Sequence, residues 1–85
     1  MKIVIFVDYS NSNFNNDFKL SNMLIERGHN VFLAINKTQF DELKKNCDLA
    51  VCGVSSDFSD LSYDLHLDKN NDIEYNLNLI LQKDV

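Results

Sequence analysis

Three short apolar runs, rich in β-branched residues, mark the first part of the chain: KIVIFVD at 2–8, VFLAI at 31–35 and DLAVCGV at 48–54. Runs that lack a polar alternation are typical of strands buried on both faces of a parallel sheet. Each gap between them is long enough for one helix. The order strand, helix, strand, helix, strand with short links predicts right-handed crossovers and a mainly parallel sheet with helices on its faces.

Both gaps carry helix signals. From Phe14 to Arg27 the apolar residues spread over more than one face, as in a crossover helix that lies on a sheet. Gly28 follows directly, where a helix can end with one residue at positive φ. In the second gap, Thr38 with Asp41 predicts a capping box and a short second helix.

His29 lies between the first helix and the second strand. This end of a crossover lies at the amino end of the strand, whereas ligands collect at carboxyl ends. We therefore interpret His29 as a turn residue and not as a ligand-binding residue.

The last third of the chain has weaker patterns. Residues 61–68, LSYDLHLD, alternate strictly and predict a half-buried strand near an edge, whose direction stays open because the link from Gly53 is short for a parallel crossover. The segment from Asn71 onward fits both a helical and an alternating period. We predict a helix, because Asn71 with Glu74 makes a cap and leucine dominates; the alternative is a hairpin with the preceding strand.

These segments predict one domain over residues 1–85, a small Rossmann-like or flavodoxin-like three-layer α/β domain with about four strands. The net charge of −5 disfavours nucleic acid as a partner, since phosphate binding needs clustered Lys and Arg. No apolar run approaches the roughly 20 residues of a membrane span. Cys47 and Cys52 match no zinc or redox spacing, so we expect buried thiols and a cytoplasmic location.

Ligands of open α/β sheets bind beyond the carboxyl ends of the strands. Three loops are predicted to project there: DYSNSN at 8–13, NKT at 36–38 and GVSSD at 53–57, with Asp57 as a further contact. Their hydroxyl, amide and carboxylate groups suit sugar or ribose hydroxyls. The predicted ligand-binding residues are Asp8, Tyr9, Ser10, Asn11, Asn13, Gly53, Ser55 and Ser56.

No cofactor or metal is predicted. Neither G-x-G-x-x-G nor G-x-x-x-x-G-K-[ST] occurs, so the dinucleotide fingerprint and the P-loop are both missing from the sequence. His66 is flanked by Asp64 and Asp68, but alternation within one strand is more typical of a solvated polar face than of a metal site.

The run NDFKLSNMLIERGHNVFLA, residues 16–34, resembles the amino-terminal region of GT-B type glycosyltransferases and related surface-carbohydrate biosynthesis proteins. Those chains commonly open with a buried strand, continue with a helix and strand of the type KL…LAERGHEVVL, and then carry a DVVV strand. The matching pieces are Lys2–Asp8, Lys19–Ala34 and Asp48–Gly53, about the first 54 residues. The resemblance implies an acceptor-side half-domain that is inactive alone, binds a sugar acceptor or nucleotide-sugar, and pairs with a second Rossmann-like domain.

Two other interpretations stay open. Nucleoside deoxyribosyltransferase-like proteins also run from a first strand into an L…GHxV unit and on to a helix with a glutamate. That resemblance implies Glu74 as the nucleophile, with Tyr9 or Asp57 helping to bind the nucleoside. The third interpretation is a non-catalytic interaction module, a small flavodoxin-like domain that forms a homodimer by sheet extension along Leu61–Leu67.

Overall fold

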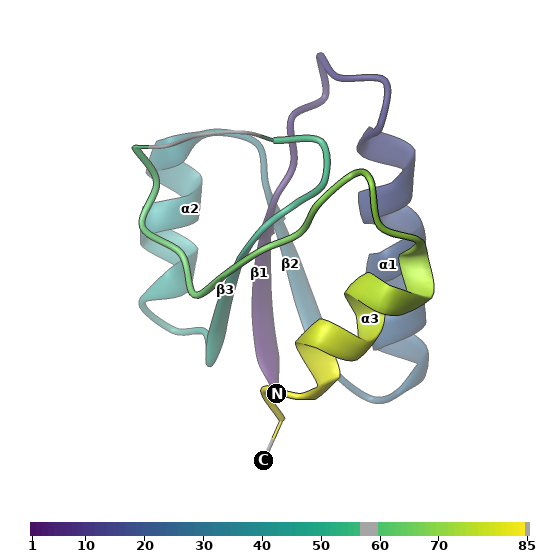
Figure 1. Cartoon of the computed structure of the whole chain (residues 1–85). Coiled ribbons are helices and arrows are strands. Elements are labelled where there is room, and N and C mark those ends of the chain that lie inside the picture. The colour runs from purple at the N-terminus through teal and green to yellow at the C-terminus, as the bar shows by residue number, and fades with distance from the viewer. Residues whose placement is uncertain (57–59, 85) are drawn as a thin grey trace.

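The computed structural model, which describes residues 1–56 and 60–84, is a parallel sheet with helices on both faces (Figure 1). The elements in chain order are β1 (Lys2–Phe6), α1 (Phe14–Glu26), β2 (Asn30–Ala34), α2 (Lys37–Lys44), β3 (Leu49–Cys52), β4 (Leu65–His66) and α3 (Ile73–Leu81). The strand order is β2-β1-β3-β4, and all three pairings are parallel. The predicted small Rossmann-like or flavodoxin-like α/β fold is confirmed.

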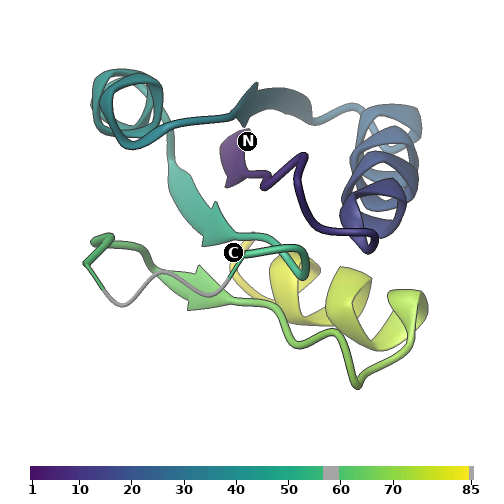
Figure 2. The ribbon, with the colours of Figure 1, turned by 90° about the horizontal axis from the view of Figure 1, so that it is seen from above.

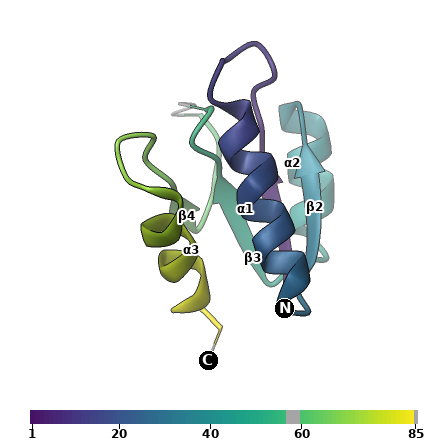
Figure 3. The same ribbon diagram turned by 90° about the vertical axis from the view of Figure 1, so that its right-hand side faces the viewer.

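The pleat of the central strand β1 divides the core into two clusters. Ile3 and Ile5 are fully buried against residues of α1 and α3, whereas Val4 and Phe6 face Phe40 of α2. The view in Figure 2 accordingly places α2 on one side of the strands and the other two helices on the opposite side. In Figure 3 those two helices lie side by side in front of the sheet. Burial on both faces explains why β1 is apolar without alternation.

The described parts of the connection from β3 to β4, residues 53–56 and 60–64, contain no helix. Leu61 and Tyr63 pack into the cluster that faces α2, and Leu65 and Leu67 pack into the opposite cluster. Burial alternates along 61–68 as predicted, but the expectation that all four apolar side chains share one face is wrong. The predicted strand is also too long, because only Leu65–His66 pairs with β3. Its direction, left open by the sequence, is parallel.

The side chain of Asp64 explains why the ladder is so short. Its Oδ2 accepts the N–H of Ala50 at 2.8 Å, and its own N–H donates to the carbonyl of Ala50 at 2.8 Å. A carboxylate thus takes the place of a backbone carbonyl at the start of β4, and one N–H of β3 is satisfied without a further strand residue.

The helix ends agree with the sequence at one place and differ at two. Gly28 ends α1 with φ +88°, as predicted. The capping box of α2 was wrong: Asn36 is the cap and accepts the N–H of Gln39 at 2.8 Å. The helix α3 is confirmed, but Asp72 caps it in place of Asn71.

His29 lies at the amino end of the sheet, as a turn residue should. Its Nδ1 is 3.1 Å from the nitrogen of Met1, and its Nε2 is 3.7 Å from a carboxylate oxygen of Asp84. Cys52 is buried, as predicted, while Cys47 is only half-buried. Within the described ranges, no helix is long and apolar enough to cross a membrane.

Replacing Phe40 by alanine is expected to destabilise the domain strongly. Phe40 is the buried anchor of α2, and its ring meets that of Phe6 edge to face with centroids 5.8 Å apart. The variant should lose about 3–5 kcal/mol of unfolding free energy in urea denaturation. Ile25→Ala, on an exposed position of α1, is the control and should stay within about 0.5 kcal/mol of the wild type. Equal losses for the two variants would contradict this packing.

Candidate functional site

A buried carboxylate joins α1 to the loop that follows β3. Asp17 is fully buried, on the side of α1 that also carries the buried residues Leu20 and Leu24. Its Oδ1 accepts the N–H of Val54 at 2.8 Å. Its Oδ2 accepts the N–H of Ser55 at 3.2 Å and the hydroxyl of Ser55 at 2.5 Å. Two loop amides that have no strand partner are thereby satisfied inside the protein.

Two opposing effects act on the pKa of Asp17: burial raises it, and hydrogen bonds to the carboxylate lower it. Burial raises the pKa of the Asp17 carboxyl above its ordinary value, while the bonds from Ser55 and Val54 oppose this shift only in part. The three donors favour the ionised form, and the surrounding apolar core disfavours it. Asp17 is therefore a buried acid whose proton affinity is coupled to the position of the loop.

Gly53 makes room for this carboxylate. A Cβ atom at position 53 would lie 2.6 Å from the carbonyl oxygen of Phe6 and 2.7 Å from both carboxylate oxygens of Asp17. The requirement is a close approach of backbone and side chain, and not an unusual φ. Gly53 was predicted as a ligand-binding residue; here the group that approaches its backbone is the protein's own Asp17.

The serines that follow link three strand ends. The hydroxyl of Ser55, which donates to Asp17, accepts the N–H of Asp8 at 3.0 Å at the end of β1. Ser56 donates its hydroxyl to the carbonyl of Phe6 at 3.4 Å. Its own carbonyl lies 3.2 Å from Nε2 of His66 in β4, which must carry the hydrogen because a carbonyl only accepts. The loop after β3 therefore fixes its neighbours on both sides.

A hollow of about 290 Å³ opens above this network, at the carboxyl ends of β3 and β4. Figure 1 shows the loops after β1, β3 and β4 together at the upper end of the sheet. We call this the strand-end hollow. It is lined by Asn11, Val54, Ser55, Ser56, His66, Leu67, Asp68, Lys69 and Asn70.

Three of the eight predicted ligand-binding residues line the strand-end hollow, namely Asn11, Ser55 and Ser56. Both serines are buried and use their hydroxyls for bonds within the protein. Asp8 and Gly53 do not line the hollow: Asp8 donates its N–H to the hydroxyl of Ser55, and Gly53 leaves space for the carboxylate of Asp17.

The other predicted residues shape the loop after β1. Oδ1 of Asp8 accepts the N–H of Ser10 at 3.0 Å and its hydroxyl at 2.6 Å. Oδ1 of Asn11 accepts the N–H of Asn13 at 2.9 Å. Tyr9 is half-exposed and rests against Phe14 and Phe18 of α1, with ring centroids 5.7 Å and 5.6 Å apart.

The remaining predicted positions fall elsewhere. The NKT loop follows β2, which is separated from β3 by β1, and its Asn36 serves as the cap of α2. Asp57 lies outside the described residues. Glu74 is exposed in the first turn of α3 and is not part of the lining of the strand-end hollow.

Sequence reasoning missed the loop after β4, which contributes Asp68, Lys69 and Asn70 to the hollow. It is a strand-end loop only if β4 is parallel, and the sequence left that direction open. Asp17 was missed as well. Its signal was present, since an acid three and seven residues before Leu20 and Leu24 lies on the same helical stripe.

A metal centre needs several ligands in one place. Over residues 1–56 and 60–84, no group of three or more His, Cys, Asp and Glu side chains comes together in this way. A scan against protein-family models found no match, and searches of curated proteins and of solved structures found no significant match either.

Replacing Gly53 by alanine is expected to cost about 2 kcal/mol or more of unfolding free energy, because the added methyl meets the backbone carbonyl of Phe6. Amide resonances of Val54 and Ser55 should move in NMR spectra. Gly28→Ala is the control: no atom lies within 4 Å of its Cβ, so only the positive φ, about 1–2 kcal/mol, opposes it. Unchanged resonances of Val54 and Ser55 in Gly53→Ala would contradict the close approach.

Replacing Asp17 by asparagine should change how stability depends on pH. With a raised pKa, the folded wild type binds more protons than the unfolded chain between the ordinary value of 3.8 and the folded pKa. The Asp17 contribution is therefore fully present below the unfolded pKa and is lost as pH rises through the folded pKa.

The test is urea denaturation of wild type and Asp17→Asn at a series of pH values. The stability of the wild type relative to the variant should be greatest at acidic pH and should fall toward neutral pH. At neutral pH the variant should still be less stable by about 1–3 kcal/mol, because its amide turns a donor toward Ser55 or Val54. A difference that does not depend on pH would contradict the raised pKa.

Proposed function

We propose that this chain is the acceptor-side half-domain of a carbohydrate-active glycosyltransferase and that its strand-end hollow binds a hydroxyl-rich ligand. The observation that carries the proposal is the hollow itself, a polar recess of about 290 Å³ at the carboxyl ends of β3 and β4. This is the place where open α/β sheets bind ligands. The resemblance of residues 16–34 to GT-B amino-terminal regions supports the sugar class.

The chemistry of the lining suits a sugar. Asn11, Asp68 and Asn70 offer amide and carboxylate groups, so the lining can both donate to and accept from hydroxyls. Each sugar hydroxyl is itself a donor and an acceptor. A recess of this size is at the small end of ligand sites, which favours a single sugar ring over a whole dinucleotide.

The rigidity of the floor supports binding at low cost in entropy. Ser55 and Ser56 are buried and bonded to Asp17 and Phe6, so residues 53–56 are held before a ligand arrives. Preorganised groups lose little conformational freedom on binding. A ligand therefore meets the held residues 53–56 on one side of the hollow and the polar side chains of Asp68, Lys69 and Asn70 on another.

The geometry gives less support to the other two interpretations. Glu74, the nucleophile of a deoxyribosyltransferase-like enzyme, is an exposed residue of α3 outside the strand-end hollow. Sheet extension along Leu61–Leu67 would rely on β4, in which only Leu65–His66 has strand geometry. Neither feature provides a formed site of the kind that the strand-end hollow provides.

The test is an amide NMR titration of the isotope-labelled chain with neutral monosaccharides, nucleosides and nucleotide-sugars. Neutral sugars should shift the amides of residues 8–13, 53–56 and 67–70, with dissociation constants of about 1 mM. Asn70→Ala should weaken this binding, whereas Asn46→Ala, an exposed position near the far end of α2, should leave it unchanged.

Three results bear on the proposal differently. Shifts with neutral sugars at the strand-end hollow support it. Shifts caused only by nucleosides would replace it with the nucleoside-transferase interpretation. No shift with any sugar or nucleotide-sugar would contradict it.

A further inference from the structure

The two edges of the sheet are built differently. β4 forms one edge with only two paired residues, and the side chain of Asp64 shortens its ladder. β2 forms the other edge with five residues, Asn30–Ala34, at one end of the row of strands (Figure 2). Natural edge strands are commonly kept from pairing by shortness, charged side chains or proline. β2 shows none of these features, because its sequence NVFLA contains neither a charge nor a proline.

The backbone of β2 leaves two residues free to pair with another strand. The N–H of Asn30 and the carbonyl of Ala34 bond to the residues that flank β1, at 3.0 Å and 2.8 Å. In a parallel ladder, residues at alternate positions point their N–H and C=O groups to the opposite side. Val31 and Leu33 therefore point theirs outward, and nothing in the described part of the chain hydrogen-bonds these groups.

The neighbouring amides select one register for such pairing. The N–H of His29 already donates within the chain at 3.2 Å, and that of Ile35 donates to Oε1 of Gln39 at 3.0 Å. A two-fold axis perpendicular to the sheet makes two copies of β2 antiparallel. Val31 of one copy then lies opposite Leu33 of the other, and each such pair exchanges both of its outward N–H and C=O groups.

The same register brings exposed apolar surface together. Phe32 is 39% exposed and lies on the α2 side of the sheet. With Leu43 and Cys47 it lines a hollow of about 290 Å³. When Val31 lies opposite Leu33, the two copies of Phe32 meet at a non-hydrogen-bonded position, where facing side chains are closest. Each ring can then cover apolar wall of the other copy's hollow.

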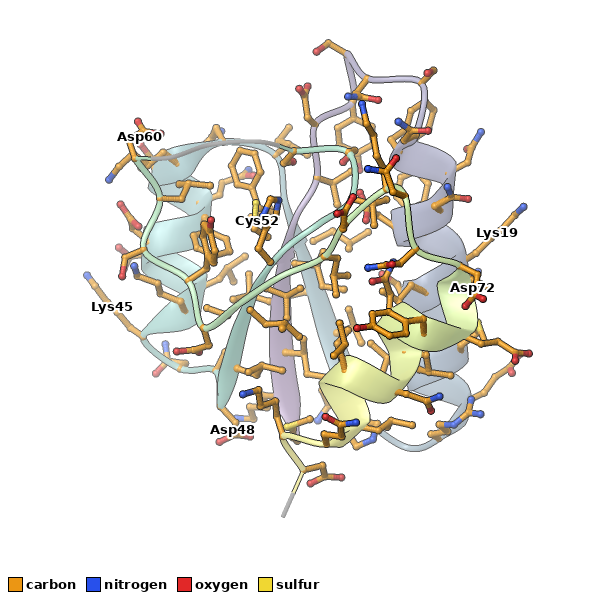
Figure 4. All side chains as sticks on the ribbon, in the orientation of Figure 1. Lys19, Lys45, Asp48, Cys52, Asp60 and Asp72 are labelled. Carbon is orange, nitrogen blue, oxygen red and sulfur yellow. The ribbon has the colours of Figure 1, made fainter. Side chains whose placement is uncertain are left out.

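The charges at this edge do not oppose a second copy. Each chain carries a net charge of −5, which by itself makes two chains repel each other. The hollow beside Phe32, however, is lined by one cation, Lys2, and one anion, Glu42. Glu42 also lies 3.3 Å from Lys45, which projects outward from the end of α2 in Figure 4. Each copy thus presents both signs, as a two-fold contact requires.

We propose that β2 is a homodimer interface, at which two copies of the chain join their sheets with Val31 opposite Leu33 and Phe32 opposite Phe32. A second copy fits because the register that uses the free groups of β2 is symmetric, so each copy supplies what the other lacks. The contact uses the β2 edge and not residues 61–67. It goes beyond the proposed function, because β1 separates β2 from β3 and the strand-end hollow stays open in the dimer.

The experiment measures the mass of the full chain by sedimentation equilibrium over a range of concentrations. Because the paired segment is short, we expect a reversible dimer with a dissociation constant of about 10–100 µM. Amide hydrogen exchange locates the contact. The amides of Val31 and Leu33 should exchange more slowly in a concentrated sample than in a dilute one, and those of Leu65 and His66 should not change.

Phe32→Lys tests the central pair. It removes both rings from the interface and sets like charges opposite each other, so the dimer should weaken about ten-fold or more. Tyr75→Lys is the matched control, because Tyr75 is an aromatic residue of α3 that is 51% exposed. In Figure 3, α3 and β2 lie on opposite sides of the domain, so this variant should dimerise as the wild type does.

Glu42→Lys decides the matter if Phe32→Lys fails to fold, since Glu42 is an exposed position of α2. It makes the rim of the interface positive in both copies and should weaken the dimer about two- to five-fold. Glu74→Lys, at an exposed position of α3, changes the net charge of the chain by the same amount and should not weaken it.

Three results would overturn the inference. One is the mass of a single chain at every concentration up to about 1 mM. Another is a dimer that protects the amides of residues 65–66 and leaves those of Val31 and Leu33 unchanged. The third is an equal loss of dimer in Phe32→Lys and Tyr75→Lys, which would show a general charge effect. Sugar binding at the strand-end hollow is tested separately, by the sugar titration.

Discussion

The carboxyl edge of this sheet depends on one interaction, the acceptance of the Val54 and Ser55 amides by the buried carboxylate of Asp17. A loop that leaves a central strand exposes amides that have lost their ladder, and they must find partners. Asp17 supplies them from a helix 37 residues earlier in the chain. Through the Ser55 hydroxyl the same contact also fixes Asp8, so the ends of β1 and β3 are positioned together.

The proposed ligand site follows from this arrangement. Residues 53–56, held by Asp17 and Phe6, form the floor of the strand-end hollow. The loop after β4 adds Asp68, Lys69 and Asn70 to its lining. Together these loops supply the mixed donors and acceptors that sugar hydroxyls need.

The sequence predicts the framework because the framework rests on local and repetitive features. Continuous apolar runs identify β1, β2 and β3 as strands, and Gly28 identifies the end of α1. The expected burial on both faces is wrong for β2, which is an edge strand in which Phe32 is 39% exposed. Helix caps were predicted less well: Asn36 and Asp72 cap α2 and α3, where Thr38 and Asn71 were expected, because several neighbouring polar residues compete for each cap and the packing of the helix decides.

The candidate site was harder to predict, because its parts are distant in the chain. Asp17 becomes important only when Gly53 leaves space for it, and no local pattern joins positions 17 and 53. The contribution of Lys69 and Asn70 depended on the direction of β4, which is set by a two-residue pairing and by the side chain of Asp64. Loops at strand ends could be identified from the sequence. Which of their residues line the hollow and which bond within the protein could not.

The most direct test of this account is native-state amide hydrogen exchange, resolved by residue, at Val54 and Ser55. If Asp17 holds the loop as described, these two amides should exchange as slowly as those of the core strand β3, because their opening requires the buried carboxylate to lose its partners. Exchange at the rate of an exposed loop amide, such as that of Lys69, would contradict the claim that the carboxyl edge is fixed from within.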